Sequence, residues 1–121
     1  MRIINITAKH LTIDTKTRTY AEKKMQKLID YIPRHARKSA TTEMTIEKYD
    51  SKGANKIEAQ ILLNLPDKQL IAKEQRDGEL AAIDGAEEKI KGQIRRYKIE
   101  QQKARQQGSI FAQIKRSLRR K

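Results

Sequence analysis

Residues 77–105 read DGELAAIDGAEEKIKGQIRRYKIEQQKAR. Apolar residues recur in this stretch at steps of three and four, the spacing of one face of an α-helix; they are Leu80, Ile83, Ala86, Ile90, Ile94 and Tyr97. Asp77 suits the N-cap position, and Glu79 suits the positive end of the helix dipole. The stretch therefore predicts an amphipathic helix that buries its apolar stripe against the rest of the chain.

The remaining faces of this predicted helix carry charge of one sign. From Lys89 to the end of the chain there are 12 Lys or Arg residues and one acid, Glu100. A solvated helix usually mixes signs, whereas a single-sign field carries a self-repulsion that a polyanion offsets. The whole chain has a net charge of +13 and a pI near 10.1. These charges indicate a partner such as nucleic acid or an anionic membrane surface.

The chain upstream predicts a small sheet and a second helix. The clearest alternation of apolar and polar residues is KIEAQILLNL, residues 56–65, which indicates a half-buried strand. The expected elements are strands at 2–8, 40–49, 56–65 and 68–76 and a helix at 15–32 that Pro33 ends. Short turns make the last three strands antiparallel, and the helical crossover makes the first two parallel. The fold class is therefore α+β, β-α-β-β-β-α, with a four-stranded mixed sheet and two helices packed on one face.

The length of 121 residues allows one domain, and we place its boundary near residue 105. We expect residues 1–105 to form the α+β domain and residues 106–121, QQGSIFAQIKRSLRRK, to form a basic, flexible tail. Gly108 and Ser109 are expected to interrupt the helix. The alternative is a segment that becomes ordered on RNA, protein or membrane.

Several function classes lack the residues that they require. The chain has no cysteine, which excludes disulfides and thiolate chemistry and fits a reducing cytoplasm. No glycine-rich phosphate loop, metal-ligand spacing or run of about 20 apolar residues is present, so we expect no cofactor, metal, small-molecule substrate or membrane span. His10 and His35 would suit acid–base RNA cleavage only if the fold joined them. Nothing in the sequence places them together, so we do not expect an enzyme.

Four stretches carry a resemblance to a known family. They are INITAKHLTID, RTYAEKKMQKL, KIEAQILLNL followed by LIAKEQRD, and AAIDGAEEKIKGQIRRYK. Over about residues 1–104 the chain resembles the ribosome hibernation-promoting factors, also called ribosome-associated inhibitor or sigma-54 modulation proteins. The last stretch is the most specific, because an AID followed by a basic-aliphatic repeat and Gln-Ile-Arg-Arg rarely arises by chance.

The resemblance implies a double-stranded-RNA-binding-like fold with an additional first strand. It also implies a cytoplasmic partner, the small ribosomal subunit of 70S-type ribosomes, bound through ribosomal RNA in the decoding region. Binding there would block messenger and transfer RNA and inhibit translation in resting or stressed cells. Carried over by position, the rRNA-binding residues are Lys24, Lys27, Lys89, Gln93, Arg96 and Lys98. The charge pattern adds Arg95 to this set.

Two other functions and two departures from the family pattern remain open. The fold alone would also suit a general double-stranded-RNA-binding module, and the basic tail would suit a membrane or partner adaptor.

Leu80 stands where many family members have an aromatic residue. The tail is basic and too short for the C-terminal domain with which long members dimerise ribosomes, so we do not expect direct dimerisation through it.

Overall fold

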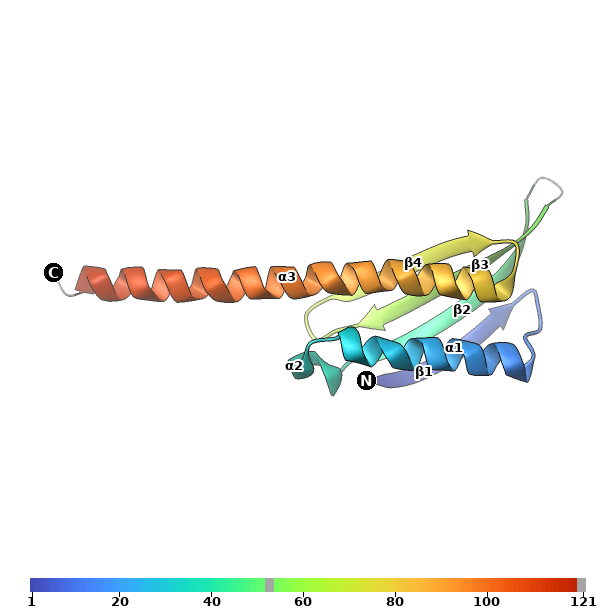
Figure 1. Ribbon diagram of the computed structural model, residues 1–121, viewed down its shortest axis with the longest axis horizontal. Helices are drawn as coiled ribbons and strands as arrows, with labels where there is room; N and C mark the ends of the chain where they lie inside the picture. Colours follow the sequence, from blue (N-terminus) through green and yellow to red (C-terminus); the bar gives the residue numbers. More distant parts are fainter. Residues whose placement is uncertain (52–53, 120–121) are drawn as a thin grey trace.

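Four strands form one mixed sheet, and two long helices lie side by side on one of its faces (Figure 1). The computed structural model describes the backbone of residues 1–51 and 54–119 and the side chains of residues 1–49 and 56–104. The elements are β1 (Arg2–Lys9), α1 (Thr15–Lys27), the 3₁₀ helix η1 (Leu28–Tyr31), α2 (Arg34–Arg37), β2 (Thr41–Ser51), β3 (Ala54–Asn64), β4 (Gln69–Arg76) and α3 (Glu79–Arg119). The predicted α+β fold class is confirmed.

The sheet has the order β1-β2-β3-β4, with β1 parallel to β2 and the other pairs antiparallel. Its register places apolar residues in rows under the helices. Ile61 on β3 pairs with Met44 on β2 and with Ala72 on β4, and all three are buried. The alternation in residues 56–65 therefore decides which face of the sheet forms the core.

The apolar stripe of α3 closes this core. Ile83, Ala86, Ile90 and Ile94 are fully buried, and Tyr97 is 2% exposed. The sequence predicts Leu80 in the same stripe, but 47% of it is exposed. Leu80 lies in the first turn of α3, where it lines a cavity of about 440 Å³ with Thr17 and Tyr20 from the start of α1. The helix thus buries its stripe from the second turn onward.

The first helix begins where the sequence predicts and ends earlier. Asp14 caps α1, because its Oδ1 accepts a hydrogen bond from the Thr17 amide at 2.7 Å. Hydrogen bonding by the Thr17 side chain, followed by this amide bond, holds the pKa of the Asp14 carboxyl below its usual value. The helix predicted for residues 15–32 ends as an α-helix at Lys27 and tightens into η1. Pro33 restricts Ile32 to an extended conformation, so the chain must leave the helix before that residue.

The last helix is longer than the sequence predicts. The expected break at Gly108 and Ser109 is absent, and the α3 backbone stays helical to Arg119, well beyond the sheet (Figure 1). One glycine costs a helix about 1 kcal/mol, which destabilises but does not terminate it. The side chains of residues 105–121 lie outside the described residues, and with them the apolar pattern of the tail. The flexibility of residues 106–121 stays a prediction.

Candidate nucleic-acid interface

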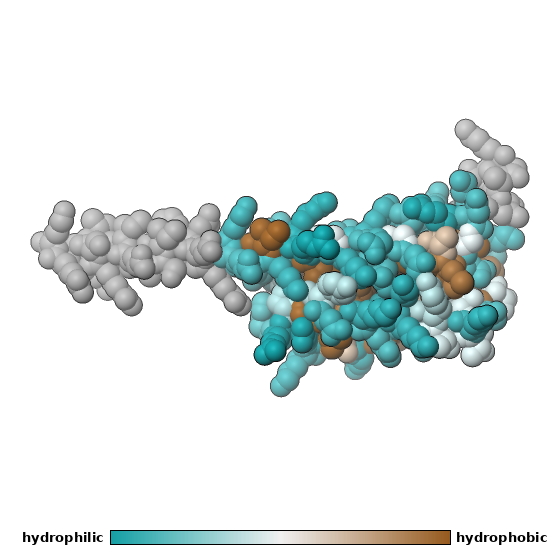
Figure 2. Space-filling view, viewed as in Figure 1, coloured by the Kyte–Doolittle hydropathy of each residue, from teal (hydrophilic) through white to brown (hydrophobic). Residues whose placement is uncertain are grey.

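The outer surface of the helix layer is largely hydrophilic, with small apolar patches (Figure 2). α1 and α3 run in the same direction across the sheet, so their C-terminal halves lie at the same end of the layer (Figure 1). All seven residues predicted to bind rRNA come from these two helices. Within the described residues, three of the seven bind other parts of the protein and four do not.

Lys24 belongs to an ion-pair cluster in the seam between α1 and α3. Its Nζ lies 3.3 Å from Asp84 Oδ1 and 3.8 Å from Glu87 Oε1, and the Tyr20 hydroxyl donates to Asp84 at 2.5 Å. Burial lowers the pKa of Lys24, but the charges of Glu87 and Asp84 outweigh it, and the net shift is upward. Lys24 is therefore charged, half-buried and engaged within the protein, where it joins the two helices.

Glu87 lies at the centre of this seam. Its side chain is 3% exposed, and its Oε1 pairs with Lys91 Nζ at 2.9 Å. The hydrogen bond to Glu87 and the charge of that carboxylate raise the pKa of Lys91 against the opposing effect of burial. Lys91 also lies 5.0 Å from the centroid of the Tyr31 ring, a cation–π distance. The seam is thus a set of paired charges that ties α1, η1 and α3 together.

Lys89 and Gln93 bind the outer edge of β4. Lys89 Nζ donates to the Lys73 carbonyl at 2.8 Å, and Gln93 Nε2 donates to the Ile71 carbonyl at 2.7 Å. Lys89 also pairs with Glu74 at 2.9 Å, and this bond, chiefly, lowers the pKa of the Glu74 carboxyl. An open strand edge is prone to pairing with other chains, and side chains that occupy its carbonyls protect it. Both residues therefore have a structural role.

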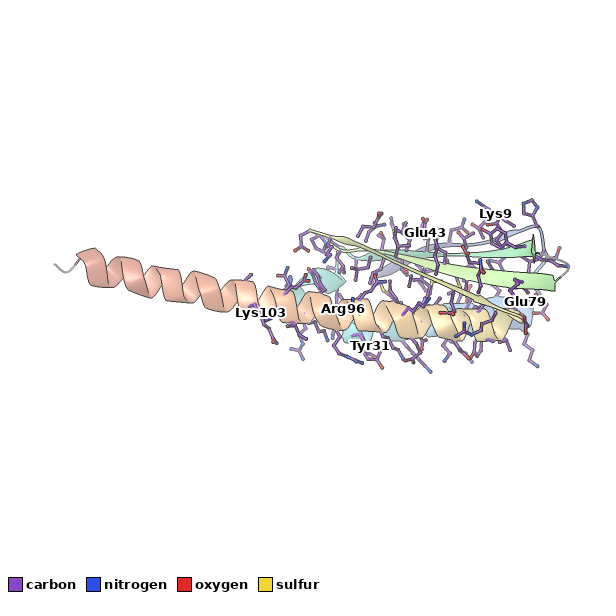
Figure 3. The ribbon with its side chains drawn as sticks, turned by 90° about the horizontal axis from the view of Figure 1, so that it is seen from above. Lys9, Tyr31, Glu43, Glu79, Arg96 and Lys103 are labelled. Carbon is purple, nitrogen blue, oxygen red and sulfur yellow. The ribbon has the colours of Figure 1, made fainter. Side chains whose placement is uncertain are left out.

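The other four predicted residues face solvent without such contacts. Within the described part of the chain, no hydrogen bond or ion pair involves the side chain of Lys27, Arg95, Arg96 or Lys98. The first three side chains are exposed, and Lys98 is half-buried. Arg96 on α3 is labelled in Figure 3. These four cations carry charge that is not neutralised within the described residues.

Charge is distributed unevenly along α3. Residues 79–91 hold four acids and two lysines, whereas residues 92–104 hold four cations and one acid. The cation-rich half lies beside α2, where Pro33 and His35 line a cavity with Lys98. The exposed Arg34 belongs to α2, and the exposed Lys38 follows it directly in the chain. One end of the helix layer is therefore strongly positive, and the other end is internally paired. The sequence shows where the charges lie along α3. Which of these charges are paired depends on residues far away in the chain, such as Lys24 and Glu74.

The open face of the sheet differs from the helix layer in charge. Lys9 and Glu43 lie on this face, opposite Tyr31 on the helix side (Figure 3). The register adds Glu47, Glu58, Lys56 and Lys73 to it. Acids and bases balance there, so the net positive charge is concentrated elsewhere on the molecule. A polyanion meets the strongest complementary field at the helix layer.

The structure does not bring the two histidines together. His10 follows β1 and lies 3.8 Å from Glu47, whereas His35 is in α2, at the opposite end of the sheet (Figure 1). Among the described residues, no group of three or more potential ligands is arranged for a metal ion. Within the same residues, no helix has both the length and the apolar character needed to cross a bilayer.

Comparison with known proteins identifies the fold and the family. Residues 4–102 match the family described as sigma 54 modulation protein / S30EA ribosomal protein. The chain belongs to this family. The N-terminal domain of Thermus thermophilus Protein Y is a similar solved structure, with a TM-score of 0.65 and 26% identity over 80% of this chain and 99% of that one.

A second structure extends the likeness of fold. A ribosomal subunit interface protein from Coxiella burnetii has a TM-score of 0.64 and 21% identity over 82% of this chain and 99% of that one. No sequence among the curated proteins matches the chain. Membership in the S30EA family, found over the region that forms the sheet and helix layer, indicates a ribosome-associated protein of the hibernation class.

Proposed function

We propose that this S30EA-family protein binds ribosomal RNA of the small subunit in the decoding region and there excludes messenger and transfer RNA. Bound in this way, it holds idle ribosomes inactive in the cytoplasm of resting or stressed cells. The family supports ribosome association, and the unpaired cations of the helix layer, all among the described residues, support RNA as the contacted component.

The observation that carries the proposal is the group Lys27, Arg95, Arg96 and Lys98. Their charges are fixed along two packed helices and have no partner in the described part of the chain. Clustered cations contact phosphates irrespective of base sequence, and they release counterions as they do so. Duplex RNA is recognised through shape, phosphates and 2′-hydroxyls, which fits a surface rich in Lys and Arg and poor in aromatic residues. Occupancy of the site would then be sufficient for inhibition.

The test is cosedimentation with purified small subunits over a salt series. The variant replaces Arg95, Arg96 and Lys98 by Gln, and the control replaces Lys9, Lys56 and Lys73 by Gln. Both variants lose three positive charges, but the control loses them from the open sheet face. We expect the helix variant to bind roughly tenfold or more weakly at ~0.1 M salt and with a shallower salt dependence. The control should bind like wild type.

Lys89 is left unchanged in this test because of its contact with Glu74. A glutamine at position 89 would remove the ion pair with Glu74 and the ammonium donor that caps the Lys73 carbonyl, so it would disturb the fold as well as the charge.

Equal losses of binding in both triple variants would show that only the total charge matters and would remove the helix layer from the mechanism.

A second measurement separates the proposal from a general RNA-binding module. We expect wild-type protein to displace initiator transfer RNA from small subunits and to resist competition by free duplex RNA. If an equal mass of free duplex competed as well as small subunits did, the protein would be a double-stranded-RNA-binding module without a ribosomal site.

A further inference from the structure

A cavity opens between α2 and α3 at the positive end of the helix layer. It is lined by Pro33, His35, Lys98, Gln101 and Gln102, and its volume is about 270 Å³. α3 passes this point as it leaves the sheet (Figure 1). Ligand pockets usually start at roughly 300 Å³, so this cavity has room for one compact group of about the size of a nucleobase and not for an extended ligand.

One wall of the cavity is held rigidly. Gln101 Nε2 donates to Asp67 Oδ2 at 2.7 Å, and the hydroxyl of the buried Tyr97 donates to Asp67 Oδ1 at 2.6 Å. These bonds fix the side of α3 that faces the β3–β4 turn. Pro33 has a restricted backbone and borders the cavity on the other side. Because the walls are formed before a ligand arrives, binding needs little ordering of the protein.

Two further groups have unused binding capacity. Lys98 provides a half-buried ammonium group, and Gln102, one turn further along α3, provides an exposed amide. Neither side chain makes a hydrogen bond or ion pair within the described residues. An amide both donates and accepts, which allows it to bind the edge of a nucleobase, whereas an ammonium group suits a phosphate. In the sequence, the only sign that Lys98 and Gln102 act together is their spacing of four residues.

We infer that this cavity receives one unstacked nucleotide of the ribosomal RNA, with its phosphate at Lys98 and its base edge at Gln102. The inference rests on the proposed function and assigns to it a contact that depends on the base. RNA-binding proteins read sequence mainly at bases released from the helix, whereas phosphate contacts alone carry no sequence information. The cavity thereby fixes the register in which the unpaired cations meet the RNA.

The experiment compares Gln102→Ala with Gln26→Ala in small-subunit binding over a salt series. Gln26 is an exposed helical glutamine on α1 whose side chain has no hydrogen bond in the described part of the chain, so both variants make the same chemical change. We expect Gln102→Ala to bind roughly tenfold more weakly with an unchanged salt slope, because a base contact releases no counterions. Gln26→Ala should match wild type. Lys98→Gln should reduce the salt slope by about one.

Chemical probing of the bound RNA gives a second readout. Wild-type protein should protect one unpaired base that becomes reactive in the Gln102→Ala complex. Wild-type affinity and unchanged protection in Gln102→Ala would overturn the assignment of the cavity while leaving the proposed function intact. Absence of any binding by the wild-type protein would overturn both.

Discussion

The two glycines inside the described core part of α3 differ in what surrounds them. A Cβ atom at Gly85 would overlap Cγ of Glu74, whereas a Cβ atom at Gly92 would meet nothing within 4 Å. Glu74 is held there by Lys89 and Arg76, so it cannot move without loss of its ion pairs. Gly85 is therefore required by the approach of β4 to the helix, and Gly92 is not required by the fold.

This difference predicts opposite effects of the same substitution. Gly92→Ala should raise the free energy of unfolding by roughly 0.5–1 kcal/mol, because alanine favours the helix and meets no neighbour. Gly85→Ala should lower it by about 1 kcal/mol or more, since overpacking outweighs that gain. Urea denaturation of the two variants measures both. If Gly85→Ala did not lower the free energy of unfolding, the Glu74 side chain would have to adopt another position that makes room for the new methyl group.

Residue roles were the least predictable part of the candidate site. The sequence identified Lys24 and Lys89 as cations on the right helices, and the structure places both there. Their carboxylate partners, Asp84 and Glu74, come from other elements, and only the packed fold reveals the pairing. Arg95 and Arg96 have no such partner in the described residues. Both side chains are exposed, in agreement with the basic outer face that the sequence predicts for this helix.

Element identities, in contrast, were predictable because periodicity and turn residues act locally. All four strands and both long helices lie where alternation and helical spacing place them. The ends differ for physical reasons: Pro33 converts the last turn of α1 into η1, and Gly108 does not end α3. Edge capping of β4 by Lys89 and Gln93 depends on which strand lies beside α3, and no local pattern reports that.

The β3–β4 turn is tied to α3 through a carboxylate that titrates. The hydrogen bond from Tyr97, followed by those of the Asp67 backbone and Gln101 and the charge of His35, lowers the pKa of Asp67 against the effect of burial. A lowered pKa means that this stabilisation is complete above the ordinary aspartate value of ~3.9 and is lost as pH falls through the native value. Burial and the bond to Asp67 raise the pKa of Tyr97 to about 12, so its phenol stays protonated throughout that range.

Asp67→Asn tests this tether. Above pH ~5 the variant should unfold at a lower temperature than wild type, and the difference should narrow as the pH is lowered below ~4. Thermal unfolding followed by circular dichroism at several pH values measures it. Asp30→Asn is the control, because Asp30 is exposed and its carboxylate has no hydrogen bond in the described residues. If the unfolding temperatures of wild type and Asp67→Asn differed by the same amount at all pH values, the stabilisation by this tether would not depend on the charge of Asp67.

At the scale of the whole molecule, stability and positive charge are placed in different regions. The buried core lies between the sheet and the layer formed by α1, η1 and residues 82–97 of α3, and the acids of α3 concentrate in this same part of the helix. The last 17 residues hold six of the 12 cations found from Lys89 onward, and no acid. The helix backbone extends away from the sheet in this region (Figure 1). Folding therefore depends on the first part of α3, and the electrostatic field depends strongly on the last part.

Removal of residues 105–121 should separate the two properties. We expect the shortened protein to keep the midpoint of thermal unfolding of the full chain, because every described core contact of α3 is retained. Its binding to small subunits should weaken and show a shallower salt dependence, since the six positive charges of this segment are lost near a polyanion. Differential scanning calorimetry and the salt-series cosedimentation measure the two effects on the same samples. A large fall in the unfolding midpoint would instead place part of the stabilising contacts beyond residue 104, and an unchanged salt slope would exclude the tail from the RNA contact.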